Sequence, residues 1–383
     1  MKTLAAGEAA AFLVGHLGLS RIEHRGAAGV RSVLGRLRCI QLDPLDPLGT
    51  NADLVALARV SGIARGDVYR HAFPGHAFEH FAKERCLLPA SAFPRYRQGA
   101  LHAPWWRHAE RLRKVPASLV EEVLAEVRER GPIGAEALAD RGKVAPLWSG
   151  WTSTGRATAM ALDVLWTRCQ IVVAGRGPRG KLYDVPERAL PPEALRPVDG
   201  DFARWALLER VQAAGLLARS GGPVWSNLAP VRKTRLPDEL VEEGLIEQAR
   251  IEGSPRTYLL PAGALDRRRP RADGRVRILG PLDPLLWDRQ LVRRAFGFEY
   301  VWEVYKPEAQ RRWGWYVVPL LHGTKLVGRL DAAVSRGALR VRRLWLEAGA
   351  DRDAVMEALE RHAHACGVDR VAGRLSSRAA KGP

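Results

Sequence analysis

A glutamine and an aspartate alternate in the segment Gln41-Leu42-Asp43-Pro44. Pro44 biases the residue before it toward an extended conformation. In an extended chain Gln41 and Asp43 point to one side and Leu42 to the other, so we expect Leu42 to anchor in the core. An amide can hold a water molecule, and a carboxylate can accept its proton or stabilise a developing cation. The pair is therefore suited to directing water at a cationic carbon. The alternative is that Asp43 caps the next turn and Gln41 is an ordinary surface residue.

A second pattern, His76-Ala77-Phe78-Glu79-His80, has the H-x-x-E-H order of some zinc peptidases. Two histidines four residues apart on one helix can share a metal ion. However, Phe78 and Phe81 are interleaved with these residues and favour a core segment, and short motifs often match by chance. We therefore expect no metal site and no cofactor, and a zinc peptidase is a minor alternative.

The elements that must position the first segment are predicted to be mostly helical over residues 1–115. Val30, Val33, Leu34 and Leu37 follow the i, i+3, i+4, i+7 spacing of a helix face. This predicted helix leads directly into Ile40 and Gln41, so its end determines where the glutamine and the aspartate lie.

One pattern of helices and strands occurs twice after residue 115. The first copy has a helix at 118–130, a short helix at 135–140, a helix capped by Ser153 and a hairpin of strands 170–174 and 181–185. Arg176 and Arg179 lie in the turn of that hairpin. The second copy has helices at 202–213 and 236–243 and strands at 245–251 and 256–260. Three helices followed by a basic hairpin are typical of a winged helix, a form of helix-turn-helix module that binds DNA.

The predicted fold class is α+β, with tandem winged-helix modules and a C-terminal, strand-rich antiparallel region. Strands are expected at 298–305, 313–321, 325–331 and 338–346, followed by a helix at 351–366. Arg311 and Arg312 lie in the turn between the first two strands. The expected divisions begin with an N-terminal helical or winged-helix domain that carries the Gln41-Leu42-Asp43 motif, over residues 1–115. A second winged helix over 116–200 and a third with a basic linker over 201–270 follow. A C-terminal β-rich domain with a closing helix over 271–370 and a disordered tail over 371–383 complete the chain.

Composition favours a nucleic-acid partner. The chain of 383 residues has 60 Lys and Arg against 42 Asp and Glu, a net charge of +18. Only nine of the 60 are lysine, and arginine binds phosphate with a planar pair of donors. Of the 12 tryptophans, most are expected in the core, whereas Trp313 and Trp315 lie beside Gly or Arg and could stack on bases.

Other features restrict the class of protein. No apolar run approaches the roughly 18 residues of a membrane span, and the N-terminus has no secretory pattern. Four scattered cysteines fit a reducing compartment. We expect a cytoplasmic, nucleoid-associated protein that does not bind membranes and acts as a monomer.

The sequence also resembles a known family, the AlkZ/YcaQ-type winged-helix DNA glycosylases, which excise alkylated bases and unhook interstrand crosslinks. The similarity is collinear over nearly the whole chain. It is carried by Ile40–Leu45, Leu54–Val60, Phe78–Glu84, Leu87–Pro89, Trp148–Trp151 with Arg156, Tyr183–Arg188, Gly280–Arg289, Phe296–Phe298, Gly314–Pro319 and Gly328–Asp331.

The resemblance implies that Gln41, Leu42 and Asp43 form the family's catalytic motif, a glutamine, an aliphatic residue and a glutamine or aspartate. It also implies a concave basic face, no metal and no lysine Schiff base. The positions after the motif, where an arginine and a Ser-His pair are common, hold Thr50, Asn51 and Ala52, and Lys83 replaces a frequent histidine. These differences lie close to the expected site and bear on the range of lesions.

The predicted function is that of a monofunctional DNA glycosylase. Its substrate would be double-stranded DNA with cationic alkylated purines of the N7-alkylguanine type, and possible targets include crosslinks and bulky genotoxin adducts. Gln41 and Asp43 are the predicted catalytic residues. The predicted DNA-binding residues are Asn51, Lys83, Arg156, Arg176, Arg179, Arg311 and Arg312. The main alternative is a winged-helix transcriptional regulator that binds DNA without catalysis.

Overall fold

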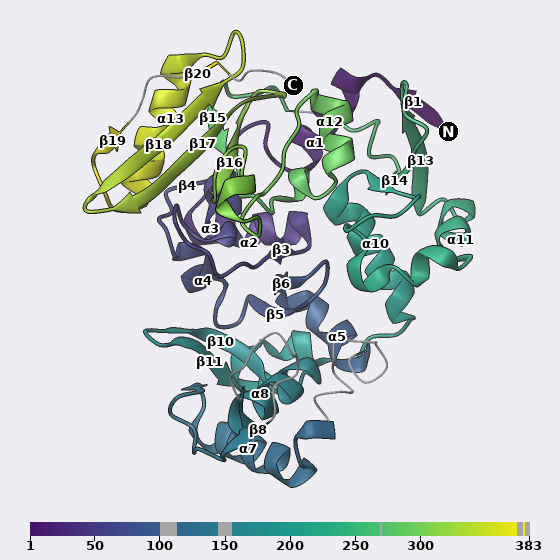
Figure 1. Cartoon of the computed structure of the whole chain (residues 1–383). Helices are drawn as coiled ribbons and strands as arrows, with labels where there is room; N and C mark the ends of the chain where they lie inside the picture. The colour runs from purple at the N-terminus through teal and green to yellow at the C-terminus, as the bar shows by residue number, and fades with distance from the viewer. Residues whose placement is uncertain (100–112, 145–154, 269, 374–377, 380–383) are drawn as a thin grey trace. The chain divides into compact units, whose positions relative to one another are not determined.

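Helices and strands of mostly modest length follow one another along the whole chain, as expected for the α+β class (Figure 1). The computed structural model describes all residues except 100–112, 145–154, 269, 374–377 and 380–383. The expected Ser153 cap and the Trp148–Trp151 stretch therefore lie outside the described residues. Within the described residues, no helix is both long and apolar enough to cross a bilayer.

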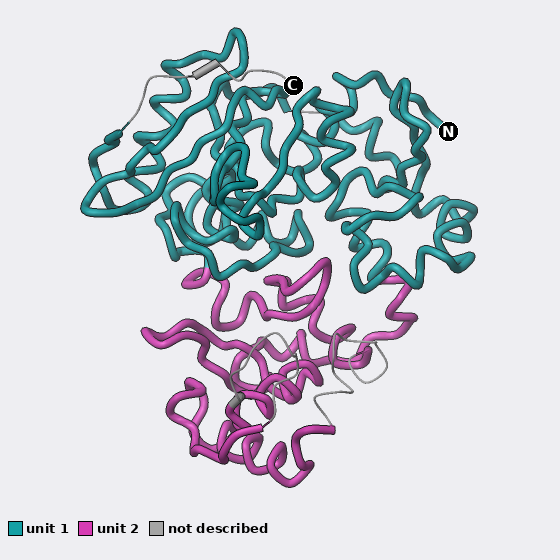
Figure 2. Tube along the Cα trace, in the orientation of Figure 1, with its two compact units in different colours: residues 1–68, 206–383 teal, residues 69–205 magenta. Residues whose placement is uncertain are grey.

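The chain divides into two compact units, residues 1–68 with 206–383 and residues 69–205 (Figure 2). These units are larger than the segments expected from the sequence, and the borders expected at 115/116, 200/201 and 270/271 stay a prediction. Each unit is described below by itself.

The unit of residues 69–205 begins with a hairpin and continues with one copy of the repeated pattern. Its elements are β5 (Ala77–Phe81), β6 (Arg85–Pro89), η1 (Ala90–Ala92), α5 (Phe93–Gly99), α7 (Ala117–Arg130), β7 (Ile133–Gly134), β8 (Lys143–Val144), β9 (Gly155–Arg156), α8 (Ala157–Thr167), β10 (Val172–Gly177), β11 (Gly180–Asp184), α9 (Pro186–Ala189) and η2 (Pro192–Leu195).

The copy of the pattern in this unit consists of α7, α8 and the hairpin β10–β11. The short strand β7 pairs with β11, so the sheet has the order β10-β11-β7. Val123 and Val127 of α7 and Val164 and Leu165 of α8 are fully buried, as their helical spacing predicts. The short helix expected at 135–140 is absent, and these residues form turns instead. The order of elements fits a winged helix, and that interpretation stays a prediction.

The N-terminal part of the other unit surrounds the Gln41 segment with short helices. Its elements are β1 (Lys2–Leu4), α1 (Ala6–His16), β2 (His24–Arg25), α2 (Gly26–Leu37), β3 (Ile40–Gln41), α3 (Asn51–Leu57), β4 (Val60–Ser61) and the first residues of α4 (Asp67–Ala72). The face of α2 formed by Val30, Val33, Leu34 and Leu37 is buried, as expected.

The second copy of the pattern belongs to the same unit as β1. Its elements are α10 (Phe202–Ala214), β12 (Leu217–Ala218), η3 (Ser226–Leu228), η4 (Val231–Lys233), α11 (Leu236–Glu242), β13 (Ile246–Ile251) and β14 (Thr257–Pro261). The short strand β12 pairs with the second hairpin strand, just as β7 does in the first copy, and β1 adds to the outer edge in the order β1-β13-β14-β12. The two copies thus share one topology.

The C-terminal part contains a sheet covered by a helix. Its elements are β15 (Val276–Ile278), η5 (Pro284–Leu286), α12 (Arg289–Phe296), η6 (Glu308–Gln310), β16 (Val317–His322), β17 (Lys325–Ser335), β18 (Ala338–Leu346), α13 (Arg352–Ala365), β19 (Val371–Gly373) and β20 (Arg378–Ala379). Strands β15 to β18 are antiparallel neighbours in chain order, and α13 packs on the sheet with Val355 and Leu359 in the core.

Two expectations for this part are wrong. Residues 298–305 are not a strand but belong to a long loop, because polar contacts within the loop replace the ladder of a sheet. Residues 371–373 and 378–379 are not a disordered tail, because they form β19 and β20. Both strands pair in parallel with β18 and satisfy backbone groups at its edge.

Candidate active site

Gln41 and Asp43 lie at the end of β3 and just beyond it. Gln41 is only 7% exposed, and Asp43 is half-buried in the bend that follows. The residue that anchors the segment is Ile40, which is fully buried. Leu42 is partly exposed, so the expected role of Leu42 as the core anchor is wrong. The strand ends at Gln41, and the strict alternation of an extended chain does not continue to Leu42.

The carboxyl group of Asp43 has one oxygen engaged locally. Its Oδ1 accepts a hydrogen bond from the backbone N–H of Leu45 at 2.9 Å. No donor among the described residues reaches Oδ2, which leaves that oxygen available to a water molecule. Burial raises the pKa of Asp43, and the bond from Leu45 opposes this shift. Asp43 therefore caps a turn and also has the free oxygen that a base needs.

Asn51 connects the Gln41 segment to a distant part of the chain. Its side-chain Nδ2 donates to the carbonyl of Gln41 at 2.7 Å, and its Oδ1 accepts from the backbone N–H of Leu282 at 3.0 Å. A Cβ atom added at Gly280 would lie 2.4 Å from Oδ1 of Asn51, so a glycine is needed for this approach. Asn51 is completely buried. In this structure it holds the backbone of Gln41 from a buried position, and its expected contact with DNA stays a prediction.

The loop that follows Asp43 is held by three contacts from other elements. Arg65 pairs with Asp46 at 2.6 Å, and Val334 N–H of β17 donates to the carbonyl of Pro47 at 2.8 Å. His362 Nε2 of α13 lies 2.7 Å from the carbonyl of Leu48. Burial lowers the pKa of His362, which favours the neutral ring, with Nε2–H as the donor. The C-terminal sheet and helix therefore position the candidate site.

A buried ion pair joins the segment just after α3 to the residues that precede α12. The two terminal nitrogens of the Arg59 guanidinium, Nη1 and Nη2, donate to the carboxylate of Asp283, at 2.7 and 3.0 Å. Arg59 Nε also donates to the carbonyl of Leu17, at the end of α1, at 2.7 Å. Arg59 is 1% exposed and Asp283 is fully buried. The pair was not singled out from the sequence, although a charged residue inside the apolar run at 54–60 is a usable signal.

The predicted DNA-binding residues within the unit of residues 69–205 differ in how far their side chains are exposed to solvent. Lys83 is buried, 7% exposed, in the turn between β5 and β6. Arg176 and Lys181 both contact the buried carboxylate of Glu79. Burial would raise the pKa of Glu79, but these two cations outweigh burial and lower it. Arg156 and Arg179 are exposed, at the start of α8 and at the tip of the β10–β11 hairpin.

The H-x-x-E-H segment forms the strand β5, in which neighbouring side chains point to opposite faces. Glu79 is engaged by Arg176 and Lys181, and His80 Nε2 lies 3.0 Å from the carbonyl of Thr167. The described residues contain no group of three histidine, cysteine or acidic side chains arranged to bind a metal. The interpretation of this segment as a helical zinc-peptidase motif is therefore wrong.

Arg311 and Arg312 lie in the long loop before β16. Arg311 is partly buried, and its Nε donates to the carbonyl of Lys306 at 2.8 Å. Arg312 is exposed, and its guanidinium lies 4.7 Å from the centre of the Trp313 ring.

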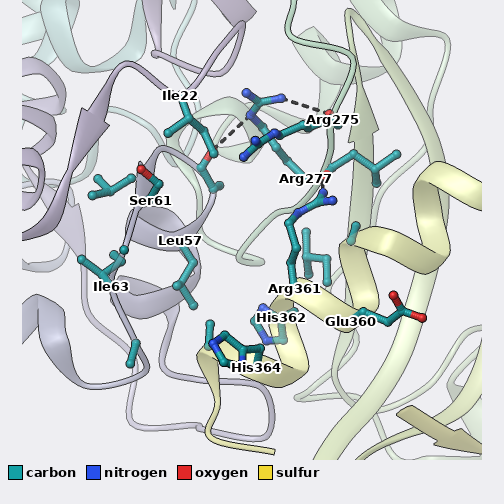
Figure 3. A pocket seen from close by; sticks show the side chains of 18 of the residues that line it. Ile22, Leu57, Ser61, Ile63, Arg275, Arg277, Glu360, Arg361, His362 and His364 are labelled. Carbon is teal, nitrogen blue, oxygen red and sulfur yellow. Dashed lines mark hydrogen bonds between the residues drawn. The ribbon is translucent and has the colours of Figure 1, made fainter. Parts of the chain in front are cut away.

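A pocket of about 680 Å³ lies between the α3–β4 segment and α13 (Figure 3). Arg275, Arg277 and Arg361 line it opposite Leu57 and Ile63. Neither Gln41 nor Asp43 lines this pocket. It is connected to the candidate site through His362, which lines the pocket and contacts Leu48.

Comparisons with known proteins give one family match and one structural match. A family model described as DNA glycosylase AlkZ-like matches residues 34–365. Among solved structures, the DNA glycosylase AlkZ of Streptomyces sahachiroi is similar, with a TM-score of 0.60 and 18% sequence identity. The alignment covers 98% of this chain and 100% of that chain. At this identity the structural match supports the fold, and the family match covers the segment that contains Gln41 and Asp43.

Proposed function

Because the chain belongs to the AlkZ-like family of DNA glycosylases, we propose that it hydrolyses the N-glycosidic bond of cationic alkylated purines, such as N7-alkylguanine, in double-stranded DNA. The observation that carries the proposal is the half-buried carboxylate of Asp43, which has one oxygen without a donor among the described residues and lies two residues from the buried Gln41. We further propose that the enzyme is monofunctional and acts as a monomer in the bacterial nucleoid, without a cofactor.

The chemistry of the substrate matches this pair of residues. Alkylation at N7 places a positive charge on the base, so the departing base needs little help from an acid. The difficult step is the formation of a cation at C1′ of the sugar and its capture by water. In our proposal the ionised Asp43 stabilises that cation and accepts the proton of the water, while the amide of Gln41 orients the water. The C1′–N9 bond breaks, the base leaves neutral, and the water oxygen bonds to C1′.

Contacts from neighbouring residues hold Gln41 and the loop after Asp43 in place, as a catalytic site requires. Asn51 holds the carbonyl of Gln41, and contacts at Asp46, Pro47 and Leu48 hold the loop after Asp43. A partly open site of this kind would accept a bulky or crosslinked base, which cannot easily be flipped into a narrow pocket. We therefore include crosslinks and bulky adducts in the proposed substrate range.

The decisive experiment is single-turnover release of base from a duplex that contains 7-methylguanine. We expect release by the wild type, and a loss of about 10²–10³-fold or more in Asp43→Asn, which keeps the shape but not the charge. Gln41→Ala should lose less, because water can still enter without the amide. The matched control is Asp266→Asn, an exposed carboxylate outside the candidate site that is paired with Lys2.

Three outcomes are distinct. Release that depends on Asp43 but not on Asp266 supports the proposal. Release that is unaffected by Asp43→Asn contradicts the mechanism. Binding without release, on both methylated and crosslinked duplexes, contradicts the activity and leaves a DNA-binding regulator.

A further inference from the structure

Residues 298–316, here called the aromatic loop, join α12 to β16 and contain only the short turn η6. Five large apolar side chains are exposed among the described residues, and the aromatic loop contains three of them. Val301 is 39% exposed, Trp315 is 38% exposed and Tyr305 is 84% exposed. Long loops of this kind in compact domains are usually functional.

The base of the aromatic loop is fixed by a stacked arginine. The guanidinium of Arg329, on β17, lies 3.9 Å from the centre of the Phe298 ring and 4.3 Å from that of the Trp313 ring. Its Nη1 donates to Glu347 at 2.8 Å. Two rings at opposite ends of the loop are thus joined through one buried cation.

The tip of the loop is fixed by a buried carboxylate. Glu303, 3% exposed, accepts hydrogen bonds from the backbone N–H groups of Arg312 and Trp313, at 3.1 and 2.7 Å. It also accepts from Lys306 Nζ at 3.0 Å. Burial would raise the pKa of Glu303, but these bonds outweigh burial and lower it, so the carboxylate stays ionised. Tyr305 therefore projects from an ordered turn.

A series of ring contacts connects Tyr305 to the candidate active site. The Tyr305 ring lies 5.7 Å from the Trp302 ring, and the Trp302 ring lies 6.2 Å from the Tyr316 ring, both edge to face. Tyr316 is fully buried, and both Trp302 and Leu45, two residues after Asp43, pack on the core cluster that contains it. Burial and then the charge of Asp43 raise the pKa of Tyr316, in keeping with this proximity.

We propose that the aromatic loop is a base-stacking element, in which the exposed ring of Tyr305 stacks on a base of the duplex beside the damaged nucleotide. The three cations of the loop, Lys306, Arg311 and Arg312, are balanced by Glu299, Glu303 and Glu308, so the loop itself is neutral. The net charge of +18 of the whole chain is what favours a nucleic acid over a protein as the partner of the exposed ring. An ordered, exposed ring can stack on any base, so it supplies affinity without sequence preference. This inference rests on the proposed function, because it places the lesion at Asp43.

The test uses a duplex whose damaged base cannot be released. A 2′-fluoro sugar on 7-methylguanine disfavours the sugar cation and blocks release, and a 2-aminopurine next to it reports stacking by its fluorescence. We expect wild-type binding to change this fluorescence. Tyr305→Ala should remove the change and weaken binding roughly tenfold. Tyr305→Phe should retain both, and Tyr305→Leu should lose the fluorescence change, because it keeps apolar area without a ring.

The control is Leu245→Ala, which removes another exposed apolar side chain, 44% exposed, outside the loop. Equal effects of Tyr305→Ala and Leu245→Ala, or retention of the signal in Tyr305→Ala, would overturn the inference. The readout needs no base release, so it separates the two proposals. Release of 7-methylguanine without a fluorescence change contradicts only the stacking role, and a fluorescence change without release contradicts only the catalytic one.

Discussion

The protonation state of Asp43 determines whether it can accept a proton from water. Burial raises its pKa from the usual 3.8, against the opposing bond from Leu45. Below the raised pKa the carboxyl is protonated and cannot act as a base, so we expect the rate of base release to fall with decreasing pH, with a midpoint above 3.8. The measurement is a single-turnover profile from about pH 4 to 8, corrected for spontaneous depurination in acid. A rate that stays constant over this whole range would contradict a base role for Asp43.

Asn51 provides a second test at the scale of single residues. Asn51→Ala leaves the carbonyl of Gln41 and the N–H of Leu282 without partners, at a cost of about 1–3 kcal/mol in unfolding free energy. We expect slower release at saturating enzyme, because Gln41 is no longer held, and unchanged affinity for uncleavable damaged DNA. Thermal unfolding and binding titrations measure the two effects separately. Lost affinity with an unchanged rate would show that Asn51 contacts DNA directly.

For single residues, the sequence shows which side chains are candidates for chemistry but not which distant residues they contact. Gln41 and Asp43 stand out because their chemistry and spacing are local. The role of Asn51 depends on Leu282, 231 positions away, and no short-range pattern reports such a contact. The pairing of Arg176 with Glu79, 97 positions away, is likewise not indicated by any short-range pattern.

Whole elements follow the sequence closely where apolar spacing is regular. The spacing of Val30 to Leu37 predicts α2. Apart from the absent helix at 135–140, the described helices and hairpins of the repeated pattern come within a few residues of their predicted bounds. Prediction fails where buried polar groups replace the ladder of a sheet. The aromatic and β-branched content of 298–305 favours a strand, but Glu303 binds the backbone of 312 and 313 and holds a loop. Likewise, the segment Ala77–Phe81 is too short and too apolar for its period to separate a helix from a strand.

The buried pair of Arg59 and Asp283 gives a prediction for the packing of elements. Asp283→Leu leaves a buried guanidinium without its carboxylate, and we expect a loss of about 3–5 kcal/mol in unfolding free energy. The double variant Arg59→Met with Asp283→Leu removes both charges and should recover much of that loss. Denaturant unfolding of the wild type, the two single variants Asp283→Leu and Arg59→Met, and the double variant measures this. If the double variant is as unstable as the sum of the single variants, the pair is not the source of the cost.

For the whole molecule, the net charge of +18 predicts DNA affinity that falls steeply with salt, because bound phosphates release counterions. Two arginines of the β10–β11 hairpin allow contacts with DNA to be distinguished from ion pairs within the protein. Arg179 is exposed at the tip, so Arg179→Ala should weaken binding to damaged and undamaged DNA alike and reduce the slope of log affinity against log salt by about one. Arg176 is paired with the buried Glu79, so Arg176→Ala should lower thermal stability and change the slope much less. Titrations at several salt concentrations decide between these roles. Equal loss of slope in both variants would mean that Arg176 leaves Glu79 to bind phosphate in the complex.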